Sequence, residues 1–245
     1  MGNSGRLKTL LVCIPLLALL SGCGIIDYYF LPAPEDTARE LFEVGDQSMR
    51  DKQYPKAVEY FTKLKDRYPF SPYTPRAELA LGDAYYLNEE YILASEAYKE
   101  FEALHPRHEQ APYVLFQIGL SNYKTFDSID KPQAAVTEAL EYFYRLRDTY
   151  PGTEYAANAA EYILKCRRTL ADHELFVADF YWRSEDYRAA WSRYLYVVKN
   201  FSDLPDVFEY AGRRAEMAYL LYQKNQSRKQ REKREGSWKD MFDWL

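Results

Sequence analysis

The chain has 245 residues, a formal net charge of −5 and 47% hydrophobic residues, which is enough apolar surface for a core and excludes disorder or a collagen-like structure. Only 10 residues are glycine and 12 are proline, so a many-stranded sandwich or barrel, whose turns need these residues, is not expected. Because the overall charge is negative, we also expect no nucleic-acid partner.

Residues 1–22 have the pattern of a targeting signal that is removed from the mature protein. The first nine residues carry two basic and no acidic side chains, and the apolar run Leu10–Leu20 is too short to span a hydrocarbon core of about 30 Å. The run ends in Leu20-Ser21-Gly22-Cys23, a box that resembles the lipoprotein signal of bacteria. The resemblance implies cleavage before Cys23 and acylation of its sulfur and amine. An ordinary secretory signal or an uncleaved anchor is the alternative.

Residues 23–35 are expected to form a lipidated tether. Pro32 and Pro34 exclude a regular helix or a central strand there. Several acyl chains on Cys23 would give durable anchoring, so outer-membrane lipid is the first expected partner. Gly24 follows the cysteine, whereas an aspartate at this position retains lipoproteins of enteric bacteria in the inner membrane. We therefore expect a protein on the outer membrane that faces the periplasm.

After the tether, small and aromatic residues recur at a spacing of 37 residues. Each copy has small residues at relative positions 8 and 20 and an aromatic residue at 24, and a proline at 32 ends three of the copies. The third copy carries an insertion of eight residues around Thr125 to Pro132. The positions 8 and 24 are Gly45 and Phe61, Gly82 and Tyr98, Gly119 and Phe143, and Ala178 and Tyr194.

This pattern resembles the tetratricopeptide repeat (TPR), which implies an all-α fold, a right-handed superhelix of about five helix–turn–helix repeats. Residues 36–153 would form an N-terminal half with repeats 1–3, and residues 154–225 a C-terminal half with repeats 4 and 5. We expect an extra helix, Glu154–Leu170, between copies three and four, and Pro205–Lys224 as the first helix of repeat 5. The segment after it, Ser227–Glu235, is too polar for an ordinary second helix.

The concave face of such a superhelix is the surface on which we expect binding. Its first-helix positions mix aromatic, arginine and aspartate side chains, which suits an extended or helical peptide with aromatic residues. The alternative is that these rings pack on the tether or on neighbouring helices. The predicted groove residues are Arg39, Phe42, Asp46, Arg50, Arg76, Asp83, Tyr86, Tyr113, Phe116 and Tyr123.

The fourth copy carries a more specific signature. The stretch Leu170–Tyr181, which includes His173 and Glu174, is followed by Arg193, and it resembles the outer-membrane assembly lipoproteins of the BamD family. The resemblance implies a scaffold of the β-barrel assembly machinery that binds unfolded outer-membrane protein substrates. It also implies that the C-terminal half docks on the barrel-forming core subunit, together with other assembly lipoproteins.

The polar segment 224–235 and the last nine residues fit that family poorly, and residues 226–245 form a second candidate surface. The segment Lys224–Glu235 holds six basic and two acidic residues. A short amphipathic helix is expected after it, which would bind a partner groove, lie on an anionic membrane surface or cover the last helix of the solenoid. Its apolar face is Trp238, Met241, Phe242 and Leu245. The predicted partner-docking residues are Arg193, Trp238 and Phe242.

No motif for catalysis, a cofactor or a metal ion is found. His173 lacks a second histidine at the zincin spacing, and His105 and His108 lack further ligands. Cys166 lies in an apolar helical pattern, so we expect it to be buried. We predict a scaffold without cofactor or metal rather than an enzyme. The alternatives are another periplasmic TPR scaffold, for cell division or polysaccharide export, or an envelope hydrolase built on an α-superhelix.

Overall fold

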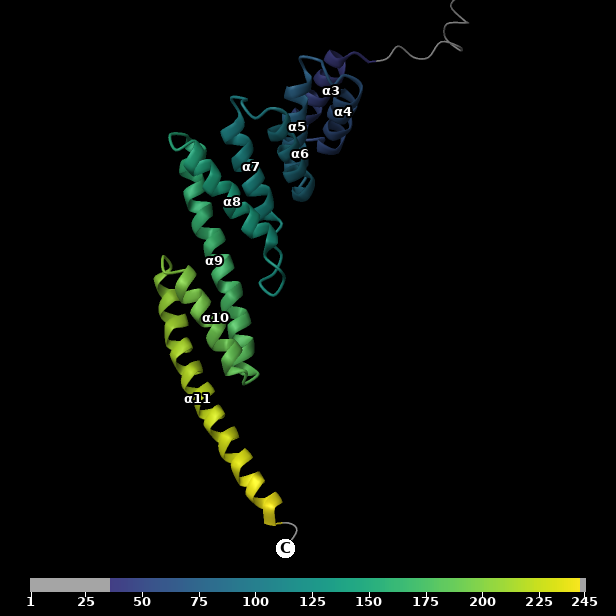
Figure 1. The fold of residues 1–245 in the computed structure, drawn as a ribbon. Coiled ribbons are helices and arrows are strands. Elements are labelled where there is room, and N and C mark those ends of the chain that lie inside the picture. The colour runs from purple at the N-terminus through teal and green to yellow at the C-terminus, as the bar shows by residue number, and fades with distance from the viewer. Residues whose placement is uncertain (1–35, 243–245) are drawn as a thin grey trace, which may run out of the picture.

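The computed structural model describes residues 36–242, and for residue 234 and residues 236–242 it describes the backbone alone. Every regular element in this part of the chain is a helix (Figure 1). The signal residues 1–22, Cys23 and the tether 23–35 lie outside the described residues. No helix in the described part is both long and apolar enough to cross a membrane. The helices are α3 (Ala38–Arg50), α4 (Tyr54–Arg67), α5 (Thr74–Leu87), α6 (Tyr91–Leu104), α7 (Ala111–Lys124), α8 (Ala134–Thr149), α9 (Glu154–Arg183), α10 (Tyr187–Asn200) and α11 (Pro205–Phe242).

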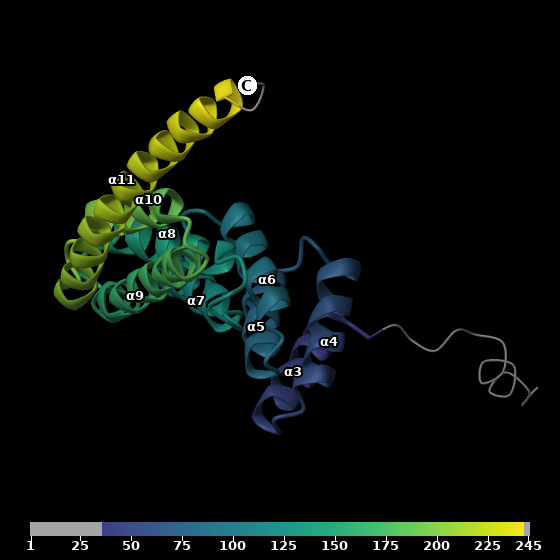
Figure 2. The ribbon, with the colours of Figure 1, turned by 90° about the horizontal axis from the view of Figure 1, so that it is seen from below.

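Consecutive helices pack side by side as hairpins, and the hairpins stack into an elongated array (Figure 1, Figure 2). The first three hairpins are α3 with α4, α5 with α6, and α7 with α8, and the fourth is α9 with α10. Each hairpin also packs on the next one, so that every second helix lies against the first helix that follows it. The predicted all-α architecture of stacked TPR-type repeats is confirmed.

Two long helices modify this plan. α9 runs without a break over 30 residues, so the extra helix expected over Glu154–Leu170 and the first helix of the fourth copy are one element. α11 runs over 38 residues and does not turn back. The fifth repeat therefore consists of its first helix alone, and the separate short helix expected near the C-terminus is the end of α11 as far as Phe242. The polar segment after Lys224 has few side chains to bury and many good helix formers, which favours continuation.

The two helices of a hairpin approach closely because a small residue faces a ring. A Cβ atom on Gly82 would lie 2.6 Å from Cε1 of Tyr98, and one on Gly45 would lie 2.5 Å from Cε1 of Phe61. Both rings are fully buried. A side chain on either glycine would displace the ring that fills the hairpin. The residues expected at positions 8 and 24 therefore meet in the core.

Three hairpin turns share one backbone conformation. Lys52, Glu89 and Glu185 have φ values of 57°, 61° and 58°, in the left-handed region that glycine adopts most easily. The N–H of the following residue bonds to a carbonyl five residues back, as Gln53 does to Ser48 at 2.8 Å, which is the Schellman pattern of helix ends. The third hairpin has a longer connection because of its insertion.

Candidate partner-binding surfaces

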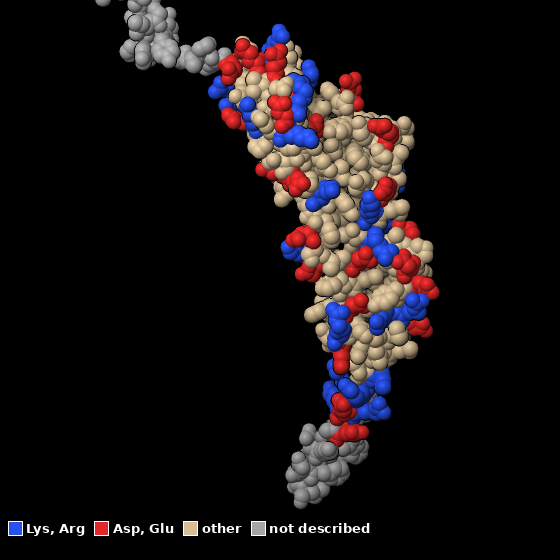
Figure 3. Space-filling view, turned by 180° about the vertical axis from the view of Figure 1, so that it is seen from behind, with Lys and Arg blue, Asp and Glu red and all other residues tan. Residues whose placement is uncertain are grey.

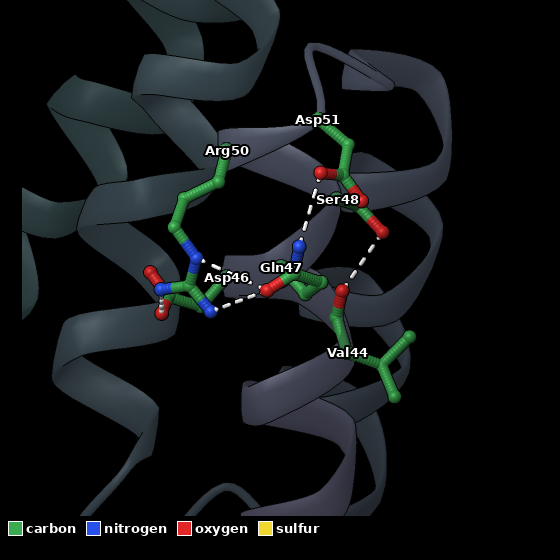
Figure 4. A network of polar contacts seen from close by, with 6 residues as sticks. All are labelled: Val44, Asp46, Gln47, Ser48, Arg50 and Asp51. Carbon is green, nitrogen blue, oxygen red and sulfur yellow. Dashed lines mark hydrogen bonds and ion pairs between the residues drawn. The ribbon is translucent and has the colours of Figure 1, made fainter.

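Two of the first-repeat candidates, Asp46 and Arg50, belong to a surface network of polar contacts on α3 (Figure 4). Asp46 and Arg50 are an ion pair, and Arg50 also donates to Oε1 of Gln47 from Nε at 3.1 Å and from Nη2 at 2.8 Å. Arg39 pairs with Glu43 at 2.7 Å. Because these exposed pairs lie within one helix, they add little to stability. Their charged groups stay open to a partner.

Phe42 is not an exposed ring, in contrast to the prediction. Its side chain is 8% exposed, and its ring lies 6.0 Å from the Phe61 ring and 5.6 Å from the Tyr73 ring, measured between centroids. The guanidinium carbon of Arg76 lies 4.5 Å from the Phe42 centroid. Phe42 therefore belongs to the core of the first hairpins. Arg76 covers it and is the group that a ligand would meet.

Asp83 and Tyr113 belong to a polar cluster inside the stack. Oδ1 of Asp83 accepts hydrogen bonds from the hydroxyl of Tyr98 at 2.6 Å and from that of Tyr113 at 2.5 Å. Gln117 donates to the Tyr113 oxygen at 2.8 Å. Burial raises the pKa of the Asp83 carboxyl, and the two hydroxyls oppose that rise. Because the cluster joins α5, α6 and α7, its first effect is to hold two hairpins together.

A row of half-buried rings continues from this cluster along α7 and α9. The Phe116 and Tyr123 rings lie 5.8 and 5.6 Å from the Tyr162 ring, and the Tyr113 ring lies 5.6 Å from the Tyr155 ring. All five rings keep part of their surface in solvent. Tyr155 and Tyr162 are not among the residues predicted from the sequence. Their spacing of seven residues, which places both on one face of a helix, was the available signal.

Tyr86 lies on α5 with its ring 5.4 Å from the ring of Tyr91, and burial raises the pKa of its hydroxyl. The ten predicted groove residues thus separate into kinds that the sequence did not distinguish. Whether they bind a peptide stays a prediction. The kinds are charged side chains at the surface (Arg39, Asp46, Arg50, Arg76), members of the polar cluster (Asp83, Tyr113), half-buried rings (Tyr86, Phe116, Tyr123) and one core ring (Phe42).

The fourth repeat contains the same polar cluster with one exchange. Oδ1 of Asp179 accepts hydrogen bonds from the hydroxyls of Tyr194 and Tyr210, the latter at 3.0 Å. Nε of Arg214 donates to the Tyr210 oxygen at 3.2 Å, where Gln117 serves in the second repeat. This cluster joins α9, α10 and α11. It places a permanent positive charge where the earlier cluster has a neutral amide.

His173, Glu174 and Arg193 of the fourth-copy signature join α9 to α10 and to the insertion. Nδ1 of His173 lies 2.5 Å from the carbonyl oxygen of Ile129 in the insertion. Because a carbonyl only accepts, Nδ1 is the donor. Glu174 pairs with Arg193 of α10 at 3.0 Å, and the Arg193 side chain stays 47% exposed. The side chains of the other docking candidates, Trp238 and Phe242, lie outside the described residues.

In the described part of the chain, burial and polar partners determine whether side chains could act as nucleophiles or metal ligands. Cys166 is fully buried, and burial raises the pKa of its thiol to about 12, so it is not a nucleophile at neutral pH. His105 contacts Glu78 at 2.6 Å. No group of three or more histidine, cysteine, aspartate or glutamate residues among those described could hold a metal ion. The expectation of no catalysis stays a prediction.

Comparisons with known proteins give a consistent set of relatives. The YfiO family model, described as an outer membrane lipoprotein, matches residues 34–234. The outer membrane protein assembly factor BamD of Vibrio cholerae serotype O1 is 28% identical over 197 residues, which cover 76% of this chain and 80% of the relative. The protein of that name from Neisseria meningitidis serogroup A is 26% identical, and the match covers 80% of this chain and 79% of the relative.

A third relative and one solved structure complete the comparison. The outer membrane protein assembly factor BamD of Caulobacter vibrioides is 25% identical over 80% of this chain and 64% of the relative. The first TPR domain of the Spaghetti protein, solved with a peptide of HSP90, superimposes with a TM-score of 0.42 at 19% identity. That match covers 55% of this chain and 93% of the other.

Proposed function

Because this chain belongs to the YfiO family of outer membrane lipoproteins, we propose that it is an assembly factor for the β-barrel proteins of the outer membrane. It is a non-enzymatic scaffold on the periplasmic side of that membrane, anchored by acyl chains on Cys23. Its first three repeats hold unfolded barrel substrates. Its C-terminal half docks on the barrel-forming core subunit and on other assembly lipoproteins.

Two observations carry the substrate role: the row of half-buried rings along α7 and α9, and an exposed arginine of α5 that has no carboxylate partner in the described part of the chain. Phe116, Tyr123 and Tyr162 expose ring surface along α7 and α9, and Arg76 has no carboxylate partner in the described part of the chain. Strands of outer-membrane barrels carry aromatic residues near both membrane interfaces. A ring of such a strand gains about 0.5–1.5 kcal/mol against another ring beyond its area burial. The carboxylate at the end of a strand would pair with Arg76.

The docking role of the C-terminal half is supported by Arg193. Its ion pair with Glu174 joins α9 to α10 at a half-exposed position, so a carboxylate of the core subunit can share the guanidinium without breaking the fold. Trp238 and Phe242 follow on α11 at helical spacing. Aromatic residues of this kind are frequent anchors of interfaces.

A peptide-binding experiment tests the substrate role. The probe is a fluorescent peptide with aromatic residues at alternate positions that ends in a phenylalanine carboxylate, titrated into the full chain in detergent and followed by anisotropy. We expect Arg76→Glu to weaken binding about tenfold and Tyr123→Ala to weaken it by a smaller factor. Arg107→Glu, in the turn between α6 and α7, is the matched charge control. Equal affinity for the carboxylate and amide forms of the peptide would remove the role of Arg76.

A labelling experiment tests the anchor. We expect Cys23→Ser to abolish incorporation of a radioactive fatty acid and to release the chain from the membrane fraction, because the thiol that accepts diacylglycerol is gone. Cys166→Ser is the control, since its thiol is buried. Persistent acyl labelling of Cys23→Ser would refute the lipoprotein interpretation.

Affinity purification from detergent-solubilised envelopes distinguishes this function from its rivals. We expect a barrel protein and further lipoproteins among the captured proteins. Partners of cell division or polysaccharide export would instead assign the scaffold to those processes. A hydrolytic activity that one carboxylate substitution abolishes without unfolding the chain would favour an enzyme.

A further inference from the structure

An open groove lies between the last two helices. It is lined by Trp191 and Leu195 of α10 and by Gly212, Ala215, Glu216 and Tyr219 of α11, and it encloses about 530 Å³. The Trp191 and Tyr219 rings lie 5.1 Å apart at one side of it. Its lining is apolar apart from Glu216, so water within it is poorly held.

The α11 wall of this groove is a surface that earlier repeats cover. Tyr113 and Tyr210 occupy equivalent places, because each donates to the aspartate of a polar cluster. Counting from these tyrosines, Gly212, Glu216 and Tyr219 correspond to Leu115, Gly119 and Asn122 of α7. All three α7 residues are buried, Leu115 and Gly119 against α8, and Asn122 with a hydrogen bond from Ser95 of α6. In α11 none of the three is buried, and Tyr219 is 41% exposed.

The groove is therefore the site of a missing second helix. α11 cannot supply that helix, because it continues in one direction to Phe242 and carries its distal part away from the groove (Figure 1, Figure 2). A solenoid whose last apolar face stays open exposes surface that a terminal helix normally covers. No segment of the described residues 36–242 covers this face.

The charge of α11 beyond the groove indicates the chemistry of the partner that would occupy it. Five basic side chains follow the groove at exposed positions, and Figure 3 shows this blue segment just before the undescribed end. Only Arg228 has a carboxylate partner in the described part, Glu232 at 3.5 Å. The five are Lys224, Arg228, Lys229, Arg231 and Lys233.

A second copy of the protein fits this charge poorly. An antiparallel α11 of a second copy would place its own Lys224–Glu235 segment, with six basic and two acidic residues, over the apolar groove, where its charges would lose water without a partner. A partner with acidic residues gains from the same segment. The charge pattern thus favours a different protein.

We propose that the α10–α11 groove binds an acidic amphipathic helix of a partner protein, which completes the last hairpin. Like every second helix in the stack, it runs antiparallel to α11, so its C-terminal part lies in the groove and its N-terminal part lies beside Lys224–Glu235. It therefore carries acidic residues in its N-terminal half and an apolar stripe in its C-terminal half. Acidic residues at that end also suit the helix dipole. A helix of about 20 residues, about 30 Å long, spans both regions.

This inference rests on the part of the proposed function that assigns partner docking to the C-terminal half. The test uses a designed probe so that the two can fail separately. The probe is a fluorescent helical peptide with glutamates in its first half and leucines at i, i+3, i+4 and i+7 in its second half. It is titrated into the full chain in detergent. A matched peptide carries lysine at each glutamate position.

We expect the acidic peptide to bind about tenfold more tightly than the lysine peptide, and added salt to reduce the difference. Gly212→Leu fills the groove without a clash, because a Cβ there would meet nothing within 4 Å, and it should weaken binding about tenfold. Gly152→Leu, at an equally open position outside the groove, should leave the affinity unchanged. Lys229→Glu together with Lys233→Glu should abolish the preference between the peptides, because the segment Lys224–Glu235 then carries four basic and four acidic residues.

Three results would overturn the proposal. One is an affinity that Gly212→Leu leaves unchanged. Another is equal binding of the two peptides. The third is binding of the basic segment to phosphatidylglycerol vesicles while the acidic peptide fails to bind, which would make this end of the molecule a membrane contact.

Discussion

The second and fourth repeats differ from the first and third in one buried atom. At the ring position of the hairpin core, the even repeats have Tyr98 and Tyr194, and the odd repeats have Phe61 and Phe143. Each tyrosine hydroxyl is bonded to an aspartate of the first helix, and that aspartate also binds a tyrosine of the next repeat. The phenylalanine repeats have no such cluster.

The ring therefore decides what the neighbouring first-helix residue does. A buried hydroxyl needs an acceptor, and Asp83 supplies it in the second repeat. In the first repeat, Asp46 holds the equivalent place but pairs with Arg50 at the surface, and in the third repeat the place is taken by Leu120, which is buried. This repeat position thus bridges two repeats where the ring carries a hydroxyl, as Tyr98 does 15 residues after Asp83, and it serves surface charge or packing where the ring is a phenylalanine.

The largest expected effect comes from removing the acceptor in only one kind of repeat. Asp83→Ala leaves the hydroxyls of Tyr98 and Tyr113 without their partner, and we expect it to lower the free energy of unfolding by about 2 kcal/mol. Asp46→Ala, at the equivalent exposed position, should change it by less than about 0.5 kcal/mol. Urea unfolding followed by circular dichroism measures both. Equal losses would show that the two aspartates play the same part.

A smaller effect isolates the hydroxyl itself. We expect Tyr98→Phe to cost about 1 kcal/mol, because one hydrogen bond is lost while Asp83 keeps Tyr113. In the Asp83→Ala background the same change should cost much less, because the hydroxyl has already lost its acceptor. A double-mutant cycle measures this coupling. Additive losses from the two substitutions would contradict a direct bond.

The pH dependence of stability should also distinguish the two kinds of repeat. Burial raises the pKa of the Asp83 carboxyl in the folded chain. The folded chain therefore keeps the carboxyl proton at pH values where the same aspartate in the unfolded chain, with a pKa of about 3.9, has released it. The resulting stability is fully present below about pH 3.9 and is lost as the pH rises through the folded pKa.

Substitution of Asp83 tests that titration. We expect the wild-type chain to lose stability relative to Asp83→Asn as the pH rises from about 4 towards neutrality. Urea unfolding at a series of pH values measures the difference, and Asp46→Asn is the control. Parallel profiles for the wild-type chain and Asp83→Asn would rule out a raised pKa.

The smallest expected effect is one that both kinds of repeat share. Lys52 and Glu89 adopt the left-handed conformation in their turns, so Lys52→Gly and Glu89→Gly should each stabilise the chain by about 0.5 kcal/mol, the relief of strain exceeding the added entropy of the unfolded chain. Thermal unfolding gives the sign. A gain in one repeat and a loss in the other would mean that the turns differ in more than sequence.

The spacing of small and aromatic residues predicts the hairpins because the contact between the small residue and the ring is nearly local in the sequence. Gly82 meets Tyr98 across one turn, and the period places both without knowledge of the rest of the fold. The unbroken course of α9 is also readable in hindsight, because the stretch around Leu170 contains no glycine or proline to end a helix.

The roles of the groove candidates depend on contacts that no single repeat contains. Phe42 occupies a first-helix position that is open in principle, but Tyr73 and Arg76 of the next hairpin close over it. Asp83 acquires its second partner, Tyr113, from a helix 30 residues further on. Only a comparison with Asp179, which has the same two kinds of partner, would have distinguished an aspartate that bridges two repeats from one that binds a ligand.

The length of α9 sets the geometry between the two halves of the molecule. A helix of 30 residues is about 45 Å long, and Arg167 and Arg168 near its middle hold Asp203 and Asp206. One extra residue before them would advance everything downstream by about 1.5 Å and rotate it by about 100°. About seven extra residues would nearly restore the orientation and add about 10 Å of reach. The number of residues in α9 therefore determines the direction in which the C-terminal half faces when the N-terminal half holds a substrate chain.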